Sequence, residues 1–225
     1  MTDKEAIIPR VMEQLERLPL VPGKPLLAVD ADEVLVNLAA HLKRFLRDHG
    51  IDMRLTEYRL DGTMFPDGSE HPLSFDESLG WLDRFFETEV LHQEALPKAA
   101  EVLKRLSSEV QIMVLTNVPK HGREKRVENL KGLAIPYPLV ENEGGKGLPL
   151  AWMKDKIQAP VIFIDDSPSQ IRSAAKHAPD VTRIHFAGAE LVERIIPKCE
   201  EANYRLTHWL DCETVIRQVL DLSHP

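Results

Sequence analysis

Three short, continuous apolar runs constrain the fold of this chain more than any other feature. They cover residues 26–29, 112–115 and 161–164, and segments with the periodicity of amphipathic helices lie between them. Apolar runs of this length that alternate with helices are typical of buried strands in a parallel sheet. Because both faces of such a sheet are covered by helices, we expect an α/β fold with a three-layer α/β/α core.

Each of these predicted strands ends in side chains that can bind or react. In chain order, these side chains are Asp30, Asp32, Thr116, Asn117, Asp165 and Asp166. Ligands of open α/β sheets bind beyond the carboxyl ends of the strands, where all six would lie. Carboxylates are costly to bury, so a strand that delivers two of them to one place usually delivers them to a site. Two such acids could hold a cation, or one could attack a substrate while the other transfers protons.

The middle of the N-terminal half loses the regular alternation. Residues 51–80 are rich in turn signals, and a short aromatic helix follows around Trp81, Phe85 and Phe86, whose rings we expect to pack together. We interpret residues 50–95 as a small, mainly helical cap inserted after the first strand and helix of a Rossmann-like core, which comprises residues 25–49 and 96–225. Residues 1–24 are expected to form an amphipathic helix over 3–18 and a linker.

Composition argues against several classes of function. The formal net charge of −8 disfavours binding to a nucleic acid polymer or to an anionic membrane, both of which usually need a basic face. No segment reaches the ~20 apolar residues of a membrane span. The two cysteines, Cys199 and Cys212, suggest no disulfide framework and fit a reducing cytoplasm. The sequence alone gives no indication of the oligomeric state.

The order and placement of the polar residues resemble the haloacid dehalogenase-like hydrolase superfamily. Asp30-Ala31-Asp32 resembles its first motif, Thr116 the second, Lys146 in a glycine-flanked loop the third, and Asp165-Asp166 the fourth. In this superfamily, an acid two residues after the nucleophile marks the phosphatase and phosphomutase branches, so Asp32 argues against dehalogenation. The long helix and cap after Asp32 loosely resemble the 5′(3′)-deoxyribonucleotidase branch.

The resemblance implies a Mg²⁺-dependent phosphomonoester hydrolase that acts on a small soluble metabolite, a nucleotide or a sugar phosphate, through an aspartyl-phosphate. Asp30 would be the nucleophile, Asp32 the proton carrier, and Thr116 and Lys146 would bind the phosphoryl group. The implied metal ligands are Asp30, Asp32 through its backbone carbonyl, Asp165 and Asp166. A phosphotransferase or phosphomutase, and a non-catalytic phosphate-binding protein of the same fold, remain as alternatives.

Two positions depart from the superfamily pattern, and two further interpretations stay open to test. Glu33 stands where glycine usually follows the second acid, and Gln170 stands where a further acid often occurs. Asn117 could contact phosphate or bond the loop backbone. We interpret the basic residues of the helix after Asn117 as a solvated face; they are Lys120, Arg123, Lys125 and Arg126.

Overall fold

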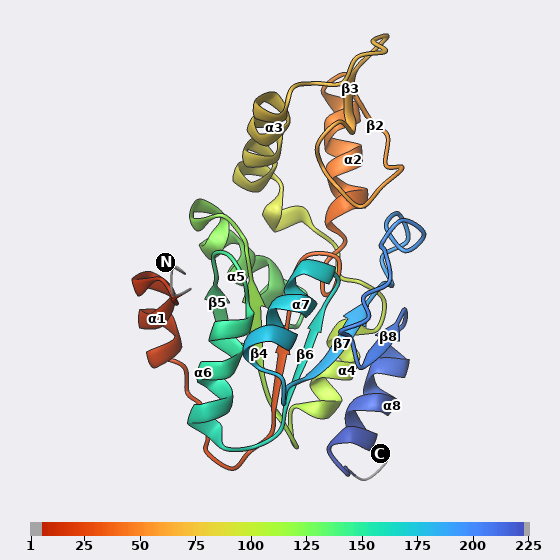
Figure 1. Ribbon diagram of the computed structural model, residues 1–225. Coiled ribbons are helices and arrows are strands. Elements are labelled where there is room, and N and C mark those ends of the chain that lie inside the picture. The colour runs from red at the N-terminus through yellow and green to blue at the C-terminus, as the bar shows by residue number, and fades with distance from the viewer. Residues whose placement is uncertain (1–5, 223–225) are drawn as a thin grey trace, which may run out of the picture.

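The computed structural model describes residues 6–222, and its centre is a six-stranded parallel sheet (Figure 1). The strand order is β5-β4-β1-β6-β7-β8. Their bounds are β1 Leu26–Val29, β4 Gln111–Thr116, β5 Leu139–Glu141, β6 Val161–Asp165, β7 Thr182–Phe186 and β8 Tyr204–Leu206. The three apolar runs form β1, β4 and β6, which lie side by side at the centre, as the continuous apolar pattern predicts.

Helices cover both faces of the sheet, which confirms the predicted three-layer core. Side chains of β1 alternate between the two faces: Leu27 and Val29 join one apolar cluster, and Leu26 and Ala28 join the other. The first cluster includes residues of α4 (Ala99–Leu106), α5 (Arg123–Gly132) and α8 (Trp209–Val219). The second includes residues of α1 (Pro9–Glu16), α6 (Gly147–Ile157) and α7 (Pro168–His177).

Helix α1 docks on the core of its own chain. Val11 and Leu15 are fully buried in the second cluster, and the Arg10 guanidinium donates to the Glu141 carboxylate at 3.1 Å. The helix is shorter than the predicted span 3–18, of which residues 3–5 lie outside the described residues. Its apolar face is therefore already covered within the chain.

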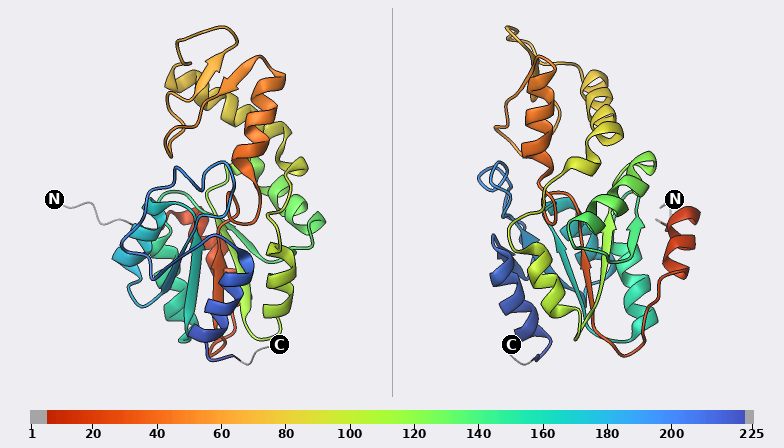
Figure 2. Two further views of the ribbon diagram at one scale, coloured as in Figure 1. Left: turned by 90° about the vertical axis from the view of Figure 1, so that its right-hand side faces the viewer. Right: turned by 180° about the vertical axis from the view of Figure 1, so that it is seen from behind.

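A separate layer lies above the carboxyl edge of the sheet (Figures 1 and 2). It comprises α2 (Leu38–Asp48), β2 (Ile51–Met53), β3 (Met64–Pro66) and α3 (Phe75–Thr88), and we refer to these residues, 38–88, as the cap. The strands β2 and β3 form an antiparallel pair that the irregular sequence pattern did not predict. Phe85 and Phe86 are buried in its apolar cluster, which confirms that the aromatic side chains pack there.

Helix α2 packs with the cap and not with the sheet. Its residues Leu42, Phe45 and Leu46 share an apolar cluster with β2, β3 and α3. The predicted boundary after residue 49 therefore falls inside a packed unit, because an amphipathic pattern does not reveal which neighbour covers the apolar face. The short 3₁₀ helices η1 (Val90–His92) and η2 (Lys120–Gly122) flank the junction between the cap and the core.

Both cysteines are buried and unpaired. Within residues 6–222, no helix combines the length and the apolar character that crossing a membrane requires.

Candidate active site

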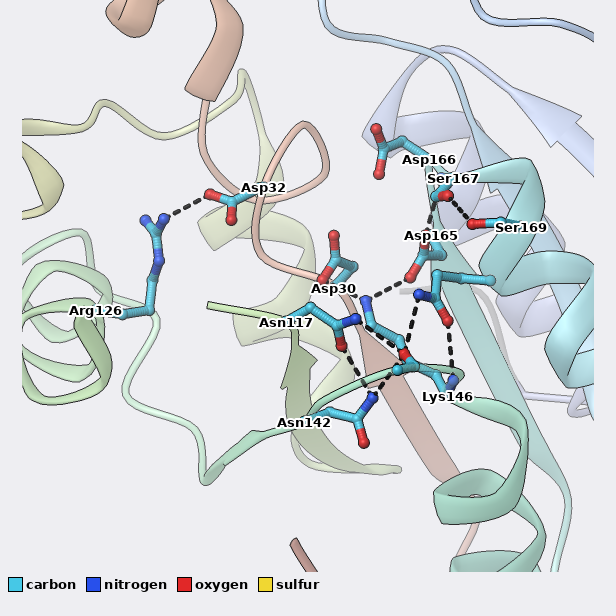
Figure 3. Close-up of polar contacts among 12 residues, drawn as sticks. Asp30, Asp32, Asn117, Arg126, Asn142, Lys146, Asp165, Asp166, Ser167 and Ser169 are labelled. Atoms are coloured by element: carbon cyan, nitrogen blue, oxygen red, sulfur yellow. Dashed lines mark hydrogen bonds and ion pairs between the residues drawn. The ribbon is translucent and has the colours of Figure 1, made fainter. Parts of the chain in front are cut away.

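Three of the four predicted acids meet at the carboxyl edge of the two central strands (Figure 3). Strands β1 and β6 pair with Val29 opposite Ile164, and the Asp30 amide donates to the Ile164 carbonyl at 2.9 Å. This register brings Asp30 beside Asp165. One carboxylate oxygen from each of Asp30, Asp165 and Asp166 lies within 4.8 Å of the other two, and all three residues are buried. The fold thus concentrates three acids at one point.

Lys146 lies between two of these acids. Its Nζ donates to Asp30 Oδ1 at 2.5 Å and to Asp165 Oδ2 at 2.6 Å, and its side chain is 2 % exposed. Burial alone would lower the pKa of Lys146, but the charges of Asp165 and Asp30 raise it above its ordinary value. The lysine is therefore held as a cation, and of the lysines that precede the fourth motif it is the one that reaches the acids.

The loop that carries Lys146 is fixed by close packing and by Gln170. A Cβ on Gly147 would lie 2.0 Å from the Ser173 carbonyl oxygen, so only glycine allows α6 to approach α7 this closely. Gln170 Oε1 accepts from the Lys146 amide at 2.9 Å, and its Nε2 donates to the Gly144 carbonyl at 3.2 Å. Gln170, one of the two departures from the superfamily pattern, thus braces the lysine loop from α7.

The charge of the acid cluster exceeds what Lys146 can neutralise. Burial raises the pKa of Asp165 to about 7 even with the lysine beside it. Burial and the neighbouring carboxylates raise the pKa of Asp166 well above its ordinary value. A buried, all-oxygen donor set with excess negative charge fits a hard divalent cation such as Mg²⁺. Asp30, Asp165 and Asp166 are the side chains that could hold it.

The cap reaches the acid cluster through Tyr58, which sequence reasoning missed. Its hydroxyl donates to Asp166 Oδ2 at 2.5 Å. Burial and the charge of Asp166 raise the pKa of Tyr58, so the hydroxyl keeps its proton. On the core side, His185 Nε2 hydrogen-bonds the Asp166 carbonyl oxygen at 2.8 Å. Tyr58 lies in an irregular segment between β2 and β3, where no periodicity gave a signal.

Asp32 lies apart from the other acids and faces Arg126 (Figure 3). The two groups approach to 2.5 Å, with the guanidinium donating to Asp32 Oδ1. Arg126 is fully buried, so the interpretation of this residue as part of a solvated helix face is wrong. Burial raises the pKa of Asp32, while the charge of Arg126 opposes that rise. The side chain of Asp32 stays 22 % exposed, which leaves it accessible from the cap side.

Thr116 and Asn117 differ in how their side chains are used. Thr116 Oγ1 is buried at the end of β4 and has no hydrogen-bond partner among residues 6–222. A buried hydroxyl without a partner is costly and points to a ligand that would complete it. Asn117 instead donates to the Gly144 carbonyl at 2.9 Å and accepts from Asn142 at the same distance. Of the two roles considered for Asn117, contact with phosphate and a bond to the loop backbone, the structure shows the bond to the loop backbone.

Glu33 occupies the tight turn that follows Asp32. Its φ of 60° lies in the left-handed region that favours glycine, which explains the glycine of the superfamily pattern. Glu33 Oε1 accepts from the Ala39 amide in the first turn of α2, a contact that glycine could not make. Burial raises the pKa of Glu33 to about 7. The carboxylate of Glu33 thus points toward α2, the first helix of the cap.

A cavity of about 410 Å³ separates the acids from the cap. Asp30, Asp32 and Asp166 border it on the core side. Pockets of roughly 300–1,000 Å³ are typical of small-molecule sites. The arrangement can therefore admit a small ligand to the nucleophile candidate Asp30.

Comparisons with known proteins identify the fold. A scan of protein families and a search of curated proteins found no match. Solved structures of haloacid dehalogenase-like proteins do match. One, of unknown function, from Agrobacterium tumefaciens is 19 % identical with a TM-score of 0.59, covering 88 % of this chain and 99 % of that chain.

Two further structures carry more specific names. A candidate phosphoglycolate phosphatase from Lactobacillus plantarum is 15 % identical with a TM-score of 0.55, covering 87 % of this chain and 100 % of that chain. A candidate β-phosphoglucomutase from Thermotoga maritima is 18 % identical with a TM-score of 0.53 and has the same coverage. The chain therefore has the fold of haloacid dehalogenase-like proteins.

Proposed function

We propose that this protein is a Mg²⁺-dependent phosphomonoester hydrolase that acts on a small molecule through an aspartyl-phosphate on Asp30. The observation that carries the proposal is the contact of Lys146 with both Asp30 and Asp165 inside the buried acid cluster. It places a fixed cation beside a carboxylate that faces a cavity. Positioning and charge stabilisation are what phosphoryl transfer mainly requires.

The first step forms a bond between a carboxylate oxygen of Asp30 and phosphorus and breaks the bond between phosphorus and the ester oxygen. Asp32 gives its proton to the departing alkoxide, which leaves as an alcohol. Lys146 stabilises the negative charge at Asp30 and on the phosphoryl oxygens. The unpartnered hydroxyl of Thr116 donates to one of those oxygens.

In the second step, water attacks the aspartyl-phosphate. Asp32 accepts a proton from that water, the bond between phosphorus and Asp30 breaks, and inorganic phosphate leaves. Arg126 holds Asp32 Oδ1, which fixes the orientation of the carboxylate during both proton transfers. Mg²⁺, held by Asp30, Asp165 and Asp166, would supply positive charge to the phosphoryl group.

A phosphatase panel with and without Mg²⁺, run on wild type and Asp30→Asn, tests the proposal. We expect turnover that needs the metal and vanishes in the variant, because the amide is not a nucleophile. Circular dichroism of the variant checks that it folds. Activity that survives Asp30→Asn would refute the nucleophile assignment. Metal binding without turnover of any ester would favour a phosphate-binding protein, and phosphate transfer to an added sugar would favour a phosphotransferase.

A further inference from the structure

The wall of the cavity opposite the acids is apolar. Residues from α2, β2, α3 and the segments between them contribute to it from the cap, and the segment after β7 contributes from the core. The side chains that form most of this wall are Leu42, Met53, Leu60, Leu82, Phe86 and Ile195. A group attached to a phosphate bound at Asp30 would therefore meet aliphatic and aromatic carbon.

Polar groups that could recognise such a substrate are few. Of the described residues that line the cavity, Arg59 is the only basic one. It is exposed and already pairs with Glu57 at 3.3 Å. Asn117 is occupied by its contacts with Asn142 and Gly144. The wall thus offers no free cation for a second anionic group, and it offers few partners for hydroxyl groups.

The remaining polar side chains of the cavity carry the wrong charge for an anionic leaving group. Apart from Tyr58, whose hydroxyl already donates to Asp166, they are all acids: Asp30, Asp32, Glu33, Glu57 and Asp166. Even with Mg²⁺ held by Asp30 and Asp166, a carboxylate or a second phosphate on the leaving group would face Asp32 and Glu57, and like charges at close range repel. Sugar hydroxyl groups buried against the apolar wall would lose their hydrogen bonds to water without replacement.

We propose that the substrate is a phosphate monoester of an apolar, uncharged alcohol or phenol, and not of a sugar, a nucleoside or a hydroxy acid. This inference rests on the proposed phosphatase function and narrows the class of its leaving group. When the leaving group enters the cavity, its apolar surface and that of the cap lose their contact with water, which favours binding. The same contact closes the cap over the phosphoryl group and keeps bulk water from it.

The test measures kcat/KM for methyl, butyl, hexyl and phenyl phosphate beside glucose 6-phosphate, thymidine 5′-monophosphate and phosphoglycolate, all with Mg²⁺. We expect kcat/KM to rise roughly threefold for each methylene that enters the cavity. Hexyl and phenyl phosphate should exceed the sugar, nucleoside and hydroxy-acid esters at least tenfold.

The outcomes separate this inference from the proposed function. If an ester of a sugar, nucleoside or hydroxy acid is hydrolysed as fast as hexyl phosphate, the inference is wrong while the phosphatase function stands. If chain length has no effect on kcat/KM, the apolar wall does not bind the leaving group and the inference is equally wrong. If no ester is hydrolysed, the proposed function itself fails.

A matched pair of variants on α3 locates the effect. Leu82 lines the cavity, whereas Leu79, one turn away on the same helix, is 41 % exposed and does not line it. We expect Leu82→Gln to lower the ratio of kcat/KM for hexyl phosphate to that for methyl phosphate about fivefold. Leu79→Gln should leave the ratio unchanged. Equal ratios in the two variants would contradict the assignment of this wall.

Discussion

Replacement of Lys146 by methionine tests whether one buried cation holds the acid cluster together. Methionine keeps most of the length of the side chain and removes its charge. The lysine lies 2.5 Å from Asp30 and 2.6 Å from Asp165, and these residues are nearly or fully buried. Loss of one partner from a buried ion pair typically costs about 3–5 kcal/mol, because the remaining charge has neither water nor a counterion.

Urea unfolding at pH 7.5 in the presence of a chelator measures this cost. We expect the free energy of unfolding to fall by about 3–5 kcal/mol, and Tm to fall by roughly 10 °C for a chain of this size. The deficit should shrink at pH 5, because burial raises the pKa of Asp165 to about 7 and this carboxylate can take up a proton in the variant. It should also shrink with saturating Mg²⁺, because a divalent cation compensates the same carboxylates.

Lys156→Met, in the last turn of the helix α6 that Lys146 precedes, is the matched control. Lys156 is exposed, and its Nζ lies 5.2 Å from the centre of the Trp152 ring. The loss of this contact should cost less than about 1 kcal/mol at any pH. If Lys146→Met were as stable as wild type at pH 7.5 without metal, the ion pairs of Lys146 would not form in solution and the reasoning would fail.

Three further contacts of the site make separate predictions. Arg126→Leu should destabilise the protein by about 1–3 kcal/mol, and by much less when Asp32→Asn is also present. If urea unfolding shows that Arg126→Leu costs the same in the wild type and in Asp32→Asn, the ion pair is contradicted. Tyr58→Phe should cost about 1 kcal/mol in the same assay through the lost bond to Asp166, and an unchanged midpoint would refute that bond. Without metal, the raised pKa of Asp165 and Asp166 means that the folded state binds more protons than the unfolded state, so Tm should fall as the pH rises from about 4 through 7. Mg²⁺ should weaken this fall, and a Tm that rises with pH in a chelator would contradict it.

The sheet and the acid cluster were predictable because their signals are local. A run of four or more apolar residues that ends in acids specifies both a buried strand and the chemistry at its carboxyl end, as at residues 26–32 and 161–166. Parallel pairing of neighbouring strands then brings those ends together without further information. The short edge strand β8 was missed because three residues at an edge carry no comparable apolar run.

Arg126 and Tyr58 could not be predicted because their partners lie far away in the sequence. Helix α5 begins Arg-Glu-Lys-Arg, a composition typical of a solvated face. The charge of the buried Arg126 is paired by Asp32, which lies 94 positions earlier in the sequence. Tyr58 likewise depends on Asp166, 108 positions later. Such contacts are set by tertiary packing and leave no periodic pattern.

The turn after β1 links the chemistry of the acids to the position of the cap. Asp30, Asp32 and Glu33 follow one another within four residues, and the Glu33 carboxylate accepts from the Ala39 amide at the start of α2. Glycine would adopt the left-handed φ of this turn without strain, but it would leave that amide without its acceptor. The glutamate therefore makes the backbone of the turn less favourable but fixes the orientation of α2, the first helix of the cap. Since α2 forms part of the apolar wall of the cavity, Glu33, the residue after the proton carrier Asp32, also helps to fix the position of that wall.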